Sequence, residues 1–75
     1  SKYRRRGYGK EGLKGLVTTA FKNGWDEVRD LIAKNNVGSQ KLFSDFGFKI
    51  VDVDKDGDVE FELGKEEFIN LYGDI

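Results

Sequence analysis

The chain has 75 residues, a net charge of −1 and neither cysteine nor histidine, which excludes disulfides, thiolate zinc sites and histidine-based catalysis. At this length it forms one domain at most, and a hydrophobic core of this size seldom contributes more than ~3 to 5 kcal/mol of net stability. No apolar run reaches the ~20 residues of a membrane span and no signal-peptide pattern opens the chain, so we expect a soluble, cytoplasmic protein that does not contact membranes.

Residues 1–10 are predicted to form a flexible basic arm in front of a single domain that spans residues 11–75. Five of these ten residues are Lys or Arg, and three arginines lie between two tyrosines. Cations and aromatic rings in this combination contact phosphates and stack on bases in single-strand binders. Nucleic-acid binding through Tyr3, Arg4, Arg5, Arg6 and Tyr8 is therefore one alternative function.

Apolar residues between positions 11 and 35 recur every three or four residues, which is the period of an α-helix. They are Leu13, Leu16, Val17, Ala20, Phe21, Trp25, Val28, Leu31 and Ile32. Because Asn23-Gly24 interrupts the pattern and acids follow, we expect two helices joined by a short turn, with one continuous helix as the alternative. A further short helix is expected from an N-cap at Ser39 to Phe46, ending at Gly47.

The next stretch predicts a β-hairpin with strands at about residues 48–53 and 58–63. Asp54-Lys55-Asp56-Gly57 fits a tight turn with Gly57 in the left-handed conformation, which pairs Val53 with Val59 and Val51 with Phe61. Alternation then places Val51, Val53, Val59, Phe61 and Leu63 on a core face and Asp52, Asp54, Asp58, Glu60 and Glu62 on an acidic face. Phe48 and Ile50 would share the acidic face, as apolar anchors with an acidic rim.

The same residues resemble the opening of an EF-hand calcium loop, with carboxylates at alternate positions and a glycine at the bend. Leu63 stands where that family has its closing bidentate glutamate, and Glu67 comes four residues late. The resemblance implies calcium as the only cofactor to consider, with Asp52, Asp54, Asp56, Asp58 and Glu67 as oxygen ligands. Without calcium we expect no cofactor.

Gly64 to Tyr72 is predicted to be a short C-terminal helix, with acids in its first turn and Gly73 after its end. The fold class is therefore α+β: a small single domain with two or three N-terminal helices, a two-stranded antiparallel hairpin and a C-terminal helix packed on one face of the sheet.

The acidic face of the hairpin suggests a non-enzymatic interaction module or small inhibitor that docks on a basic protein surface. Carboxylates on one strand face lie ~7 Å apart, a spacing similar to that of phosphates, so the row would mimic nucleic acid. The residues expected to bind the partner are Phe48, Ile50, Asp52, Asp54, Asp58, Glu60 and Glu62. We do not expect an enzyme, because the sequence shows neither a nucleophile beside a base nor a glycine-rich phosphate loop between a strand and a helix.

Overall fold

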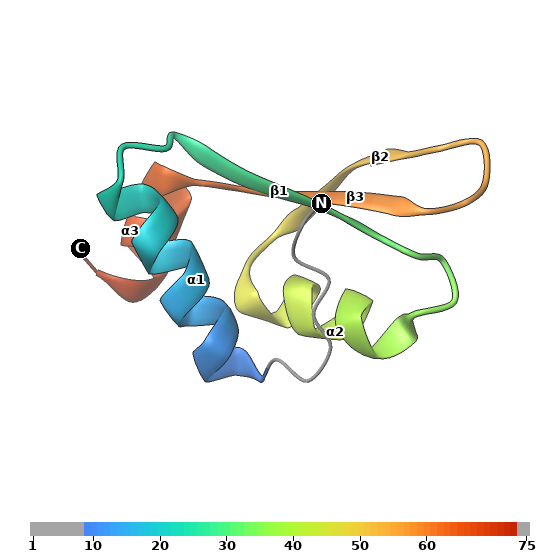
Figure 1. The fold of residues 1–75 in the computed structure, drawn as a ribbon, viewed down its shortest axis with the longest axis horizontal. Coiled ribbons are helices and arrows are strands. Elements are labelled where there is room, and N and C mark those ends of the chain that lie inside the picture. The colour runs from blue at the N-terminus through green and yellow to red at the C-terminus, as the bar shows by residue number, and fades with distance from the viewer. Residues whose placement is uncertain (1–8, 74–75) are drawn as a thin grey trace.

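The computed structural model describes residues 9–73, which form three helices and a three-stranded antiparallel sheet (Figure 1). In chain order the elements are α1 (Lys10–Lys22), β1 (Glu27–Ile32), α2 (Val37–Phe46), β2 (Lys49–Val53), β3 (Val59–Gly64) and α3 (Lys65–Tyr72). The strand order is β1-β3-β2, so β3 is the central strand and β1 and β2 lie at the edges. The predicted α+β class is confirmed, with one strand more than the hairpin. Residues 1–8, most of the predicted arm, lie outside the described range.

The turn predicted at Asn23-Gly24 ends α1. Gly24 has a φ of 96°, in the left-handed region that glycine adopts readily. Its N–H donates to the carbonyl of Phe21 at 3.1 Å, and the N–H of Trp25 donates to the carbonyl of Ala20 at 3.2 Å. This is the Schellman arrangement, which satisfies carbonyls that the helix end would leave unpaired.

The prediction of a second helix after this turn is wrong, because residues 27–32 form the strand β1. Antiparallel pairing with β3 brings Val28 opposite Leu63 and Ile32 opposite Val59. Val28 and Ile32 therefore face the core at strand spacing, and only Ile32 is fully buried. Their separation of four residues fits a helix as well as a strand, so the apolar period was ambiguous over this short stretch.

The helix α2 begins earlier than predicted. Its N-cap is Asn36, whose side-chain oxygen accepts a hydrogen bond from the N–H of Ser39 at 3.2 Å, so the cap is three residues before the expected Ser39. Its predicted end is confirmed: Gly47 has a φ of 127° and donates its N–H to the carbonyls of Phe43 and Ser44. The C-terminal helix α3 also lies where the sequence predicted it.

The hairpin is confirmed, but its register contains a bulge. Val53 pairs with Val59 as predicted, whereas Phe61 pairs with Ile50 and not with Val51. The shift lies between Ile50 and Asp52, where β2 has one extra residue. Such a bulge reverses the alternation on one side of it, so the predicted assignment of Ile50 to the acidic face is wrong.

The three helices and the inner face of the sheet enclose one core. Its buried members are Leu13, Val17, Phe21, Ile32, Phe43, Phe46, Phe48, Val59, Phe61, Leu63 and Phe68. In Figure 1, α1 and α2 lie on the same side of the strands, and the β2–β3 turn projects past them. None of the helices within residues 9–73 has the length and apolar character needed to cross a bilayer.

Candidate functional site

The N-terminal end of α1 is exposed, and no side chain among the described residues 9–73 caps it. The first intrahelical hydrogen bond joins the N–H of Leu13 to the carbonyl of Gly9 at 3.1 Å. The N–H groups of Lys10, Glu11 and Gly12 precede it, and Gly9, the N-cap, has no side chain to accept from them. These four residues are all exposed. A helix end of this kind presents N–H donors and the positive end of the helix dipole to an anion.

The sequence at this helix end contains a glycine pattern that the sequence analysis missed. Gly7, Gly9 and Gly12 have the spacing G-x-G-x-x-G, and α1 begins at Lys10, within the pattern. Where this spacing opens a helix, the glycines let a phosphate approach the backbone closely. The pattern is common in sequences, so it indicates a phosphate site only where a helix begins within it. The prediction of an arm over residues 1–10 placed no helix start there. The residues before Gly9 lie outside the described range, so the expectation that the chain has no glycine-rich loop between a strand and a helix stays a prediction.

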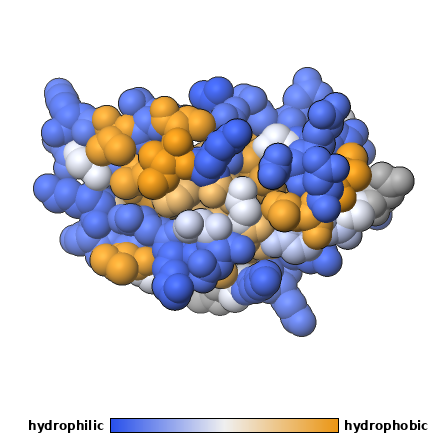
Figure 2. All heavy atoms as spheres, turned by 180° about the vertical axis from the view of Figure 1, so that it is seen from behind, coloured by the Kyte–Doolittle hydropathy of each residue, from blue (hydrophilic) through white to orange (hydrophobic). Residues whose placement is uncertain are grey.

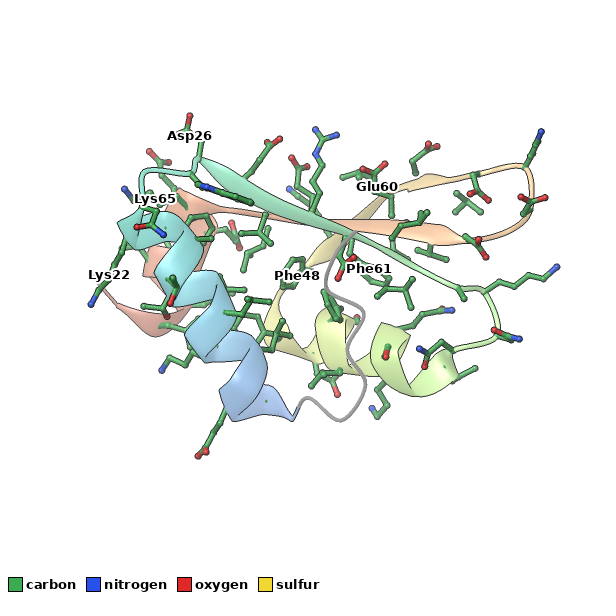
Figure 3. The ribbon with its side chains drawn as sticks, viewed as in Figure 1. Lys22, Asp26, Phe48, Glu60, Phe61 and Lys65 are labelled. Atoms are coloured by element: carbon green, nitrogen blue, oxygen red, sulfur yellow. The ribbon has the colours of Figure 1, made fainter. Side chains whose placement is uncertain are left out.

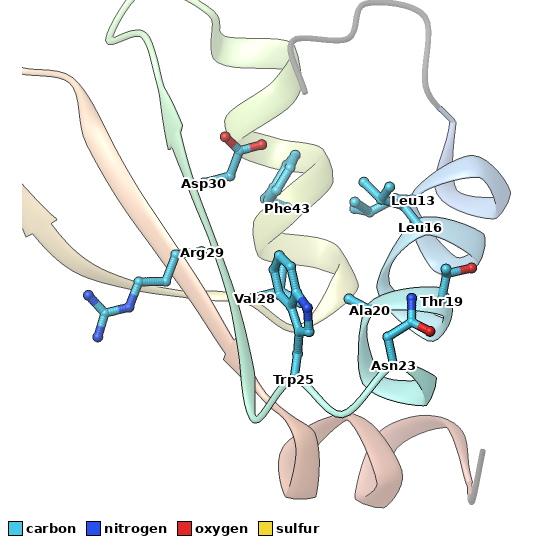
Figure 4. Close-up of a pocket in the computed structure, with 10 residues that line it drawn as sticks. All are labelled: Leu13, Leu16, Thr19, Ala20, Asn23, Trp25, Val28, Arg29, Asp30 and Phe43. Atoms are coloured by element: carbon cyan, nitrogen blue, oxygen red, sulfur yellow. The ribbon is translucent and has the colours of Figure 1, made fainter. Parts of the chain in front are cut away.

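A groove of about 280 Å³ lies between α1 and the edge strand β1 (Figure 4). Its lining is mostly apolar and consists of Leu13, Leu16, Thr19, Ala20, Asn23, Trp25, Val28, Arg29, Asp30 and Phe43. Figure 4 shows Trp25 standing between β1 and α1, and its side chain is about half exposed. Leu13 lies one helical turn after Gly9, so the groove and the exposed helix end belong to the same side of α1's first turns.

The carboxylates of the central strand lie on the outer face of the sheet, around one arginine. Arg29 contacts Glu27 at 3.2 Å, Glu62 at 3.4 Å and Glu60 at 3.6 Å. A hydrogen bond to Glu62 raises the pKa of the Glu27 carboxyl above its ordinary value, with desolvation adding to it and the charge of Arg29 opposing it. The charges of Glu27 and Glu62 in turn raise the pKa of Arg29. Part of the predicted acidic face is thus an ion-pair network within the chain.

The acids of the hairpin turn serve as hydrogen-bond acceptors for the backbone. The Asp54 side chain accepts from the N–H groups of Asp56 and Asp58, both at 2.9 Å, and Asp58 accepts from the N–H of Lys34 at 3.0 Å. Gly57 has a φ of 88° and donates its N–H to the Asp54 carbonyl, as the predicted turn requires. Within residues 9–73 no three acidic side chains converge as a metal site would need.

The other predicted site residues are dispersed. Phe48 is only 4% exposed and packs on Phe43 at 4.7 Å, so its expected role as an accessible anchor is wrong (Figure 3). Figure 3 shows Phe48 and Phe61 on the helix side of the sheet and Glu60 on the opposite side. Asp52 pairs with Glu60 on the outer face, and Glu67 lies in the first turn of α3. The nucleic-acid candidates Tyr3, Arg4, Arg5, Arg6 and Tyr8 lie outside the described residues.

Comparison with curated proteins and with solved structures finds no match. One family model does match: the acetyltransferase (GNAT) family, over residues 1–48. The match covers the glycine pattern, α1, β1 and α2, and it ends before β2, so the acidic hairpin is not part of it. It contradicts the expected non-enzymatic interaction module or inhibitor, both alternatives (the calcium module and the nucleic-acid-binding arm) and the expectation that the chain is not an enzyme. Because the matched residues make up more than half of the chain, the chain belongs to the acetyltransferase (GNAT) family.

Proposed function

We propose that the chain acts in acetyl transfer and that the exposed N-terminal end of α1 binds the pyrophosphate of the donor, acetyl-CoA. The observation that carries this proposal is the coincidence, within the family match, of a G-x-G-x-x-G pattern with an uncapped helix start. Acetyl-CoA supplies the activated acetyl group. The residues of the chain bind and orient the donor.

The donor set at this helix end fits a pyrophosphate. Within residues 9–73 no side chain caps the first three backbone N–H groups, and Gly9 leaves the approach to them open. A Cβ added at Gly9 would meet no heavy atom within 4 Å, which shows how open the N-cap position is. Lys10 and Lys14 add positive charge to the first turns, while Glu11 opposes them. The helix dipole and the N–H groups favour an anion here.

The groove beside α1 supports the same proposal because it suits the rest of a long, flexible donor. Cofactor sites combine a mostly apolar wall with a few polar groups that fix orientation. The groove has such a wall, with Trp25 as its largest aromatic member and Asp30 as an ionisable one, while the Arg29 side chain points away toward the glutamates of the outer face (Figure 4). We propose that the part of acetyl-CoA beyond its pyrophosphate lies along this groove, which would place Trp25 in contact with acetyl-CoA.

The substitution Gly9→Asp separates binding from folding. An aspartate N-cap stabilises a helix relative to glycine by a few tenths of a kcal/mol, so the chain should fold at least as well. The same carboxylate occupies the free N–H groups and repels a phosphate. We expect CoA to change the fluorescence of Trp25, the only tryptophan, and Gly9→Asp to weaken that binding by about tenfold or more, which corresponds to ~1.4 kcal/mol.

The matched control is Gly64→Asp. Gly64 is also an N-cap without a side-chain cap, at α3, with a φ of −85° and no atom within 4 Å of an added Cβ. Gly64 pairs with Glu27, so the added acid meets a like charge and should bring no gain in stability, but this variant should bind CoA as the unchanged chain does. CoA binding by the unchanged chain should also weaken as the salt concentration rises, because it depends on the charge of the phosphates. Absence of CoA binding by the unchanged chain, or equal affinity in Gly9→Asp, would overturn the proposal.

A further inference from the structure

The edge strand β2 exposes an apolar stripe that the proposed function does not use. Ile50, Val51 and Val53 are 58%, 42% and 54% exposed. Within residues 9–73, β3 is the only strand that pairs with β2, so the other edge of β2 is open. Figure 2 shows apolar side chains gathered at the hairpin end of the molecule, seen from behind. An open edge with exposed β-branched residues is a template for a further strand.

The charges at the two ends of this edge are complementary to those of a second copy. Lys49 begins the strand, and Asp54 follows its end, with three apolar residues and Asp52 between them. A copy that runs antiparallel presents the same sequence in reverse, so the cation of each copy meets an acid of the other. A strand with one sign of charge at both ends would repel its own copy instead.

We propose that β2 is a self-association surface, on which two copies of the chain pair antiparallel about a two-fold axis between Val51 and Asp52. In this register Ile50 lies opposite Val53 of the partner subunit, and Lys49 lies opposite Asp54 of the partner subunit. The interface is isologous, so each of these contacts occurs twice.

The bulge makes this register consistent with the faces of the sheet. Residues that lie directly opposite each other on antiparallel strands share a face. Ile50 and Val53 pair with Phe61 and Val59, whose side chains are both buried on the helix side. Without the extra residue in β2, Ile50 and Val53 would point to opposite faces and could not meet across the axis. The bulge therefore joins them into one stripe.

The size of the contact predicts a weak dimer. A strand of five residues is ~17 Å long, and one such edge falls short of the ~800 Å² per partner that stable interfaces bury. Dimers should therefore accumulate only as the chain is concentrated, and the apolar stripe should dominate their stability.

Sedimentation equilibrium of the chain, from low micromolar to near-millimolar concentration, tests the proposal. We expect a monomer–dimer equilibrium, and Ile50→Lys should weaken it by about tenfold or more, because an ammonium group then replaces the apolar contact of each Ile50 with Val53 of the partner subunit. The matched control is Val37→Lys, which places the same charge at a position that is 69% exposed at the start of α2. It should leave the equilibrium unchanged. Circular dichroism confirms that both variants are folded.

Cross-linking tests the register independently, because the chain has no cysteine of its own. A mixture of Ile50→Cys and Val53→Cys chains should form a mixed disulfide dimer faster than Val37→Cys cross-links to either, since disulfides need Cα atoms within ~7 Å. A monomer at every concentration would overturn the proposal. So would Ile50→Lys chains that associate normally, or cross-linking no faster than that of Val37→Cys.

Discussion

Asn36 stabilises α2 through a single side-chain contact. Its oxygen accepts from the N–H of Ser39, one of the donors that a helix start leaves without an intrahelical partner. Asn36→Ala should lower the free energy of unfolding by about 1 kcal/mol, the usual cost of removing an N-cap. Urea denaturation measures it. Ser39→Ala removes the residue that the sequence suggested as the cap and should have a much smaller effect; an equal loss in both variants would contradict this assignment.

Glycine signals in the sequence were reliable wherever a positive φ is required. Gly24, Gly47 and Gly57 all adopt one, at the turn, the helix end and the hairpin that the sequence predicted. Local steric rules decide such positions, with little influence from distant residues. Phe48 is the opposite case: its burial depends on Phe43 and Phe46, which α2 brings to it. No local pattern contains that information.

At the scale of elements, β1 shows where the sequence was insufficient. Its neighbour in the sheet is β3, about thirty residues later in the chain, and the pairing, not local preference, makes residues 27–32 a strand. The bulge in β2 is similar, because it is defined only by the partner strand. The site follows the same division: the glycine spacing is visible in the sequence, while the groove exists only once α1 lies beside β1.

The network on the outer face predicts how stability depends on pH. The pKa of Glu27 lies above its ordinary value of 4.5 in the folded chain. The folded state then binds this proton more readily than the unfolded state, so stability from this group is present below the unfolded pKa and is lost as pH rises through the folded pKa. At neutral pH the charged Glu27 is therefore unfavourable to folding.

Glu27→Gln should raise the melting temperature at neutral pH, and the difference from the unchanged chain should vanish in acid, where Glu27 is protonated. Thermal unfolding followed by circular dichroism at several pH values measures this. The control is Glu66→Gln, an exposed acid in the first turn of α3. A variant that melts lower than the unchanged chain at neutral pH would show that the ion pair with Arg29 outweighs the contact with Glu62.

At the scale of the whole molecule, Phe46 connects elements that the sequence places far apart. Its ring lies 4.8 Å from that of Tyr72, 5.9 Å from that of Phe48 and 6.3 Å from that of Phe68. The Tyr72 hydroxyl donates to the Phe46 carbonyl at 2.5 Å, and burial raises the pKa of that hydroxyl. Phe46 thus joins α2, the start of β2 and α3 in one core.

Phe46→Ala should abolish cooperative unfolding. Removing a buried phenylalanine costs ~3 to 5 kcal/mol, as much as the whole net stability expected of a chain this short. Phe46→Leu keeps most of the volume and should remain folded with a lower melting temperature. Val37→Ala, at an exposed position, should change little. Because α1 packs on the same core, Phe46→Ala should also lose CoA binding, whereas Phe46→Leu should retain it; calorimetry and CoA titration of the three variants measure both effects.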